Sequence, residues 1–151
     1  MPNRAGFTTI EMVMVVIIIG VIATVAFPRI RGALESQNVR SARAASTTFV
    51  ATARAAAVQR GCRGTLHMRA DGRMWVTVCT VTPGIGKTLD TLGPVEPIGE
   101  RYRVTVAPSR DSVAFDARGL KSGFERVTVI FANNDVRDSL VVNELGKVVR
   151  Q

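Results

Sequence analysis

The 151-residue sequence is poor in the side chains that enzymes use for catalysis. Its single histidine, His67, lies in a predicted strand, where a packing or surface role is expected rather than general-base or metal-binding chemistry. Two cysteines and one histidine fall short of the three or four ligands that a zinc site needs. The carboxylates are scattered, without a pair at acid–base spacing. We therefore predict no catalytic residue, no metal site, no cofactor and no enzyme.

Aromatic and nucleotide-binding features are also scarce. Aromatic residues make up 5% of the chain, so stacking platforms for single-stranded nucleic acid are expected to be few. Residues 83–88, PGIGKT, resemble the end of a phosphate-binding loop. The full motif needs a glycine where Val81 stands, and a following helix that LDTLGPVEP does not favour. Nucleotide binding is therefore not expected.

Acidic residues are outnumbered by basic ones, 12 against 20, and the excess is local. The segment 29–73 carries nine arginines and only two acidic residues. At helical spacing Arg40, Arg43 and Arg54 fall on one face. A basic cluster beside a membrane indicates contact with anionic lipid or an acidic protein neighbour, and nucleic acid is the alternative partner.

The sequence does contain one long apolar run near its start. Phe7–Phe27 comprises 21 residues, and Glu11 is its only charged residue. At ~1.5 Å per residue the run extends ~31 Å, close to the ~30 Å hydrocarbon core of a bilayer. A cleaved secretory signal fits poorly, because the run is long and no A-x-A-like site precedes Pro28. An acid inside an apolar span is costly unless partnered, so Glu11 indicates a function.

The helical pattern continues beyond this run. Apolar residues, mostly alanine, recur every three or four positions through residues 29–60. We predict one helix from about Phe7 to Arg60, ended by Gly61. Gly20 and Pro28 weaken the helix, and a bend is expected at the proline. The segment between them is therefore predicted to be easy to stretch or unwind.

The pattern changes to β from Thr65. Alternating residues in TLHMRA and RMWVTVCT flank Asp71-Gly72, which predicts a hairpin. Residues 81–99 are rich in glycine and proline and predict a long irregular loop. Five more strands are expected at Tyr102–Ala107, Ser112–Asp116, Arg126–Ala132, Leu140–Asn143 and Lys147–Arg150. The predicted fold class is α+β, a long N-terminal helix packed on an antiparallel β-sheet head.

The state of Cys62 and Cys79 depends on the compartment. A structural disulfide is expected if the β-rich part lies outside the cytoplasm, whereas in the cytosol both would be buried free thiols.

The N-terminus resembles the type IV pilin and pseudopilin superfamily. The resemblance rests on Gly6 before Phe7, a glutamate as the fifth residue of the run, an unbroken apolar stretch, and Pro28 at its end. It implies that a prepilin peptidase removes the leader 1–6 and that Phe7 is then N-methylated. It implies further a transmembrane and filament-core helix at 7–28, an amphipathic continuation at 29–61, and a β-rich periplasmic or extracellular head at 62–151.

The resemblance also implies roles and partners. Glu11 would pair with the Phe7 amine of a neighbouring subunit during assembly, and the Gly20–Pro28 segment would melt in the filament. The subunit would sit in the inner membrane with a periplasmic head, and then contact other pilin subunits and the assembly platform.

The C-terminal half resembles the GspH/FimT group of minor pilins and pseudopilins. That resemblance depends on Phe115, Gly119 and Gly146. It implies a minor subunit of a type IV pilus or a type II secretion pseudopilus, acting in initiation or at the tip. The alternative is a pilus-displayed receptor for DNA uptake. Lys147 stands where the group usually has arginine, and the chain lacks the basic Gly-Arg-x-Arg of the DNA-uptake members.

Overall fold

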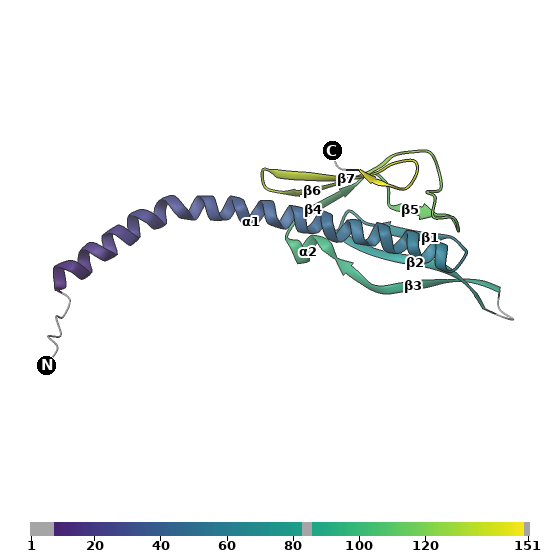
Figure 1. The fold of residues 1–151 in the computed structure, drawn as a ribbon, viewed down its shortest axis with the longest axis horizontal. Helices are drawn as coiled ribbons and strands as arrows, with labels where there is room; N and C mark the ends of the chain where they lie inside the picture. Colours follow the sequence, from purple (N-terminus) through teal and green to yellow (C-terminus); the bar gives the residue numbers. More distant parts are fainter. Residues whose placement is uncertain (1–7, 83–85, 150–151) are drawn as a thin grey trace. The chain divides into compact units, whose positions relative to one another are not determined.

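The computed structural model describes residues 8–82 and 86–149, which form two compact units (Figure 1). The first unit is 1–34, and the second, which we call the head unit, is 35–151. The elements are α1 (Thr9–Gln59), β1 (Gly64–Met68), β2 (Arg73–Thr82), β3 (Gly86–Pro97), α2 (Ile98–Tyr102), β4 (Thr105–Pro108), β5 (Ser112–Phe115), β6 (Val127–Asn133), β7 (Val136–Val142) and β8 (Val148–Val149).

The long helix α1 confirms the predicted helix over its described part, while Phe7 lies outside the described residues. It remains helical through positions 20 and 28, so neither Gly20 nor Pro28 interrupts it. At its end Gly61 has φ +60°, and the amide of Cys62 donates to the carbonyl of Ala57. A left-handed glycine followed by this backward hydrogen bond terminates many helices, because it satisfies carbonyls that the last turn leaves free.

The strands form two four-stranded antiparallel sheets, with orders β3-β2-β1-β5 and β4-β6-β7-β8. The predicted hairpin at Asp71-Gly72 joins β1 to β2, with Met68 opposite Met74. Gly72 has φ +83°, and its amide donates to the carbonyl of Arg69, as a tight turn with a left-handed glycine requires. The α+β fold class is therefore confirmed.

The core of the head unit lies between α1 and both sheets (Figure 1). From the helix it takes mainly small side chains, including the fully buried Ala42, Ala53 and Ala57. From the strands it takes larger ones, such as the fully buried Phe115 and Phe131. The small helix face lets β1 approach closely at Gly64, where a Cβ would lie 2.5 Å from the Ala53 carbonyl oxygen.

The predicted irregular loop at 81–99 is wrong over most of its length. Residues Gly86–Pro97 form β3, which pairs with β2 from Thr82↔Gly86 to Arg73↔Pro97, and α2 follows. β3 is an edge strand, and one of its sides has no partner strand. Prolines, which have no N–H to donate, are tolerated in such a strand. A register shift opposite Met74 and Val76 accommodates Gly93-Pro94-Val95. The glycines and prolines of this segment therefore belong to an irregular edge strand rather than to a loop.

Candidate assembly and docking sites

The described N-terminal part of α1 presents an apolar surface to its surroundings. Its large side chains from Ile10 to Leu34 are about half to two-thirds exposed, for example Ile10 at 69% and Val21 at 62%. By length and composition this stretch is able to cross a membrane. An apolar surface of this extent in water would be strongly unfavourable, so it needs lipid or another protein as a neighbour.

Glu11 lies in the first turn of this apolar helix. Its backbone amide donates to the Thr8 carbonyl at 3.1 Å. Within residues 8–82 and 86–149, no basic side chain forms an ion pair with its carboxylate. Gly6 and Phe7, the predicted processing residues, lie outside the described part of the chain.

The three arginines predicted as one anionic-contact set have different surroundings. Arg43 is largely buried, and its Nε lies 2.8 Å from Oδ2 of Asp138 on β7. The Nε–H group of Arg43 does not form a hydrogen bond of acceptable geometry with Asp138, so the attraction between the two charges holds the pair. Arg40 and Arg54 are exposed. The helical periodicity could not reveal the Arg43 partner, because Asp138 lies 95 positions away in the sequence.

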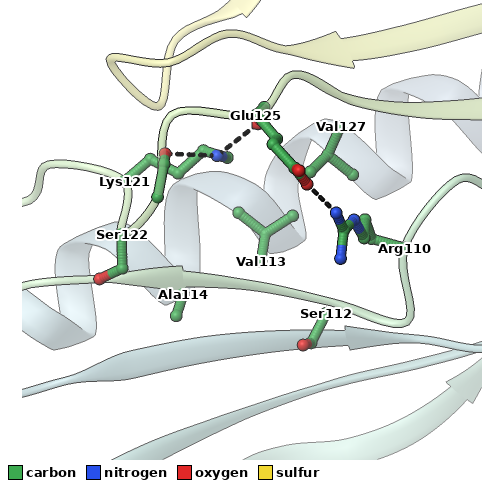
Figure 2. Close-up of a pocket in the computed structure, with 9 residues that line it drawn as sticks. Arg110, Ser112, Val113, Ala114, Lys121, Ser122, Glu125 and Val127 are labelled. Atoms are coloured by element: carbon green, nitrogen blue, oxygen red, sulfur yellow. Dashed lines mark hydrogen bonds and ion pairs between the residues drawn. The ribbon is translucent and has the colours of Figure 1, made fainter.

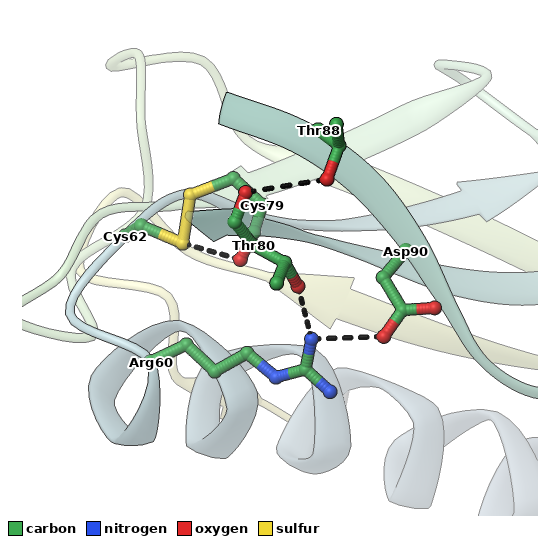
Figure 3. A network of polar contacts seen from close by, with 6 residues as sticks. All are labelled: Arg60, Cys62, Cys79, Thr80, Thr88 and Asp90. Atoms are coloured by element: carbon green, nitrogen blue, oxygen red, sulfur yellow. Dashed lines mark hydrogen bonds and ion pairs between the residues drawn. A yellow bond between two sulfur atoms is a disulfide. The ribbon is translucent and has the colours of Figure 1, made fainter. Parts of the chain in front are cut away.

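Cys62 and Cys79 form a disulfide that joins the end of α1 to β2 (Figure 3). Beside it, Arg60 extends from the helix end to the β2–β3 ribbon, where it donates to Thr80 and lies 2.9 Å from Asp90 (Figure 3). The disulfide closes a loop across 17 positions and thereby stabilises the folded state. The exposed ion pair between Arg60 and Asp90 adds little further stability. Sequence reasoning found the cysteines but not Arg60.

Of the residues singled out near the C-terminus, Gly146 lies against Phe115, whereas Gly119 lies against α1. Phe115 is fully buried at the end of β5, and a Cβ on Gly146 would lie 2.8 Å from its ring. Gly119 has φ +75°, and a Cβ there would lie 3.0 Å from Val58 and 3.1 Å from the Arg54 guanidinium. Gly146 therefore requires glycine for both conformation and space, whereas at Gly119 the positive φ is the main reason for glycine.

The loop between β5 and Gly119 is held by Asp116. Its Oδ1 accepts hydrogen bonds from the amides of Leu120 at 2.8 Å and Arg118 at 3.0 Å. These bonds, the Leu120 amide first, lower the pKa of the Asp116 carboxyl.

A pocket of about 260 Å³ lies beside this loop, between β5 and the start of β6 (Figure 2). Its charged groups are satisfied within the chain: Arg110 pairs with Glu125, and Lys121 Nζ donates to the carbonyls of Gly123 and Glu125 at 2.8 and 2.6 Å. The two serines that line it, Ser112 and Ser122, have no histidine in this pocket to activate them.

His67 has the packing role that the sequence predicted. Its ring stacks on Trp75 with centroids 4.9 Å apart, and its Nε2 lies 2.9 Å from the Thr77 hydroxyl. Burial lowers the pKa of His67 from 6.5. Among the described residues no group of three potential ligands could hold a metal ion. The pairing with Trp75 was readable from the predicted hairpin register, but was not predicted.

Comparison with known proteins supports the architecture. No family model matches the sequence, and no curated protein matches it. The solved structure of the type IV minor pilin FimU of Pseudomonas aeruginosa is similar over 76% of this chain and 89% of that one, with 14% identity and a TM-score of 0.53. The minor pseudopilin EpsH from the Type 2 Secretion System of Vibrio cholerae matches over 76% and 96%, with 11% identity and a TM-score of 0.54. At these identities the likeness shows that the chain has the fold of minor pilins and pseudopilins.

Proposed function

We propose that this chain is a minor subunit of a type IV pilus or of a type II secretion pseudopilus, and acts without catalysis in initiation or at the tip. The observation that carries the proposal is the apolar N-terminal helix with a single acid in its first turn. Its continuation into a head unit with the fold of a minor pilin and a minor pseudopilin supports the same assignment.

Processing would occur before the helix rather than after it. A prepilin peptidase would cut between Gly6 and Phe7 and leave Phe7 with a methylated amine. Because the apolar helix remains, the mature subunit stays in the inner membrane with its head in the periplasm. From there it would move into a filament with other subunits, at an assembly platform.

Glu11 would supply the register for this assembly. Placing a lone carboxylate in an apolar environment has a free-energy cost on the order of several kcal/mol unless a cation lies beside it. The positively charged Phe7 amine of an adjacent subunit is such a partner. Pairing removes an uncompensated buried charge from each subunit, so correct neighbours are favoured over incorrect ones.

The segment from Gly20 to Pro28 would then adapt to its neighbours. It is helical in the isolated chain. A glycine and a proline make this stretch the least costly part of the apolar helix to unwind.

The test compares Glu11→Ala with Val13→Ala in cells that assemble the filament. We expect both variants to lose the leader and to fractionate with the inner membrane. Only Glu11→Ala should be depleted from sheared filaments, by roughly tenfold or more if one charge pair of at least ~1.4 kcal/mol is lost. Equal incorporation of the two variants would exclude the charge-pairing role.

A further inference from the structure

Strands β2 and β3 continue beyond the part of their sheet that has four strands. β1 pairs with β2 as far as Val78, and one more backbone bond follows, from the Cys79 amide to the Arg63 carbonyl at 3.0 Å. Beyond it, among the described residues, β2 pairs with β3 alone, as far as Thr82↔Gly86. In Figure 1 the two strands extend past the end of α1. We call this two-stranded end, residues 79–82 and 86–90, the arm.

The arm has little contact with the core. On β2, Val78 is fully buried, whereas Cys79 and Thr80 are half-buried. On β3 all residues from Gly86 to Thr91 are exposed, and the Leu89 side chain is 78% exposed. A ribbon of two strands is marginally stable at best in water, because it lacks a third strand or a helix to cover one face. The arm therefore needs a tie to the rest of the head unit.

Two contacts among the described residues tie the base of the arm to the end of α1 (Figure 3). The disulfide joins Cys62, which follows the helix-ending Gly61, to Cys79, the first residue of the arm. Arg60 donates to the Thr80 hydroxyl and lies 2.9 Å from Oδ2 of Asp90. One covalent bond and one cation therefore hold both strands of the arm at the same level.

The disulfide is the stronger of these two contacts. The side chains of Arg60 and Asp90 are 35% and 51% exposed, so water and salt screen their attraction. A covalent bond is not screened. When the bond is absent, β1 is still held in the head unit by β2 on one side and β5 on the other, with Leu66 fully buried. Loss of the bond therefore acts first on the arm.

We propose that the arm is a redox-controlled folding unit, ordered while Cys62 and Cys79 are joined and detached when they are reduced, with the rest of the head unit still folded. A dithiol reductant supplies two electrons and two protons through a mixed disulfide. The S–S bond breaks, both cysteines become thiols, and the dithiol becomes a disulfide. Because both cysteines are half-buried, the bond lies close to the surface. The proposal concerns the head unit alone and does not depend on Glu11.

Two backbone amides report on the arm directly. The Cys79 amide bonds to Arg63, so Cys79 is directed away from β3, and the next residue, Thr80, is directed toward it. Thr88 is the register partner of Thr80, and its hydroxyl also donates to the Thr80 carbonyl at 3.4 Å (Figure 3). The amides of Thr80 and Thr88 therefore bond between the two strands of the arm. They become free to exchange with solvent when the arm detaches.

The experiment is hydrogen–deuterium exchange of the full-length chain in a neutral detergent, before and after reduction with dithiothreitol. Exchange is read at single amides of the arm and of β6, which lies between β4 and β7. We expect the Thr80 and Thr88 amides to exchange about a hundredfold faster after reduction, the factor for a loop of this length. The β6 amides should remain strongly protected, because their two neighbouring strands stay in place.

Variants separate the two ties and the reductant. Cys62→Ser should exchange as the reduced chain does without any reductant. Arg60→Gln in the oxidised chain should speed exchange in the arm by less than about fivefold, as expected for an exposed ion pair. The matched control is Arg101→Gln, which removes a 2.9 Å ion pair with Glu96 near the other end of β3 and should leave the arm unchanged.

Three results would overturn the proposal. The first is slow exchange of Thr80 and Thr88 in the reduced chain, which would mean that strand pairing alone holds the arm. The second is an equal loss of protection in the arm and in β6, which would mean that reduction unfolds the head unit as a whole. The third is a mass that the reductant does not change, because no bond would then exist to control the arm.

Discussion

Replacing Gly146 with alanine should destabilise the head unit more than replacing Gly93, although both glycines have nearly the same φ. Their φ values are +77° and +74°. Alanine in this left-handed region costs about 1–2 kcal/mol at either position. A Cβ on Gly93 meets nothing within 4 Å, whereas a Cβ on Gly146 would lie 2.8 Å from the Phe115 ring and 3.3 Å from Lys121.

The extra cost at Gly146 comes from overpacking. Phe115 is fully buried and has no room to retreat, so the turn 143–146 would have to shift. Inserting a methyl group into such a site costs about 1–3 kcal/mol more. For a domain of this size about 3–5 °C of melting temperature corresponds to 1 kcal/mol. Gly146→Ala should therefore melt about 3–15 °C below Gly93→Ala.

The assay is thermal unfolding of the full-length chain in neutral detergent, followed by Trp75 fluorescence and near-ultraviolet circular dichroism. Adding Phe115→Leu to Gly146→Ala should recover part of the difference, because the smaller side chain vacates the space that the new methyl group needs. Melting temperatures that agree within about 1 °C for the two glycine variants would refute the reasoning. They would mean that backbone conformation alone, and not contact with Phe115, requires glycine at position 146.

Two further predictions concern the head unit. Reduction of the Cys62–Cys79 disulfide should raise the mass by about 2 Da and lower the free energy of unfolding by about 3 kcal/mol, the value for a loop of this length. The double variant Cys62→Ser and Cys79→Ser should melt at the same temperature as the reduced chain, whereas an unchanged mass on reduction would show that the thiols are free. Because burial lowers the pKa of His67, the unfolded chain binds its proton more readily, so stability should be complete above about pH 6.5 and fall as the pH drops through that value. His67→Gln should flatten this part of the profile, and an unaltered profile in that variant would assign the pH dependence to another group.

Much of the fold follows from local sequence patterns. The continuous helix, its end at Gly61 and the hairpin at Asp71-Gly72 depend on neighbours within a few positions, so periodicity and turn chemistry predict them. The edge strand β3 was mistaken for a loop because glycine and proline are tolerated wherever one side of a strand has no partner, and only the sheet order reveals such a position.

The apolar N-terminal helix, the acid at position 11 within it and the α+β class can be read from the sequence alone, because these are local properties of the chain. Folding brings together residues that are far apart in the sequence. It paired Arg43 with Asp138 and brought Phe115 under Gly146. It placed Trp75 beside His67, Arg69 and Arg73. Such contacts depend on strand order and register, which join residues that are distant in sequence, and no short-range pattern encodes them.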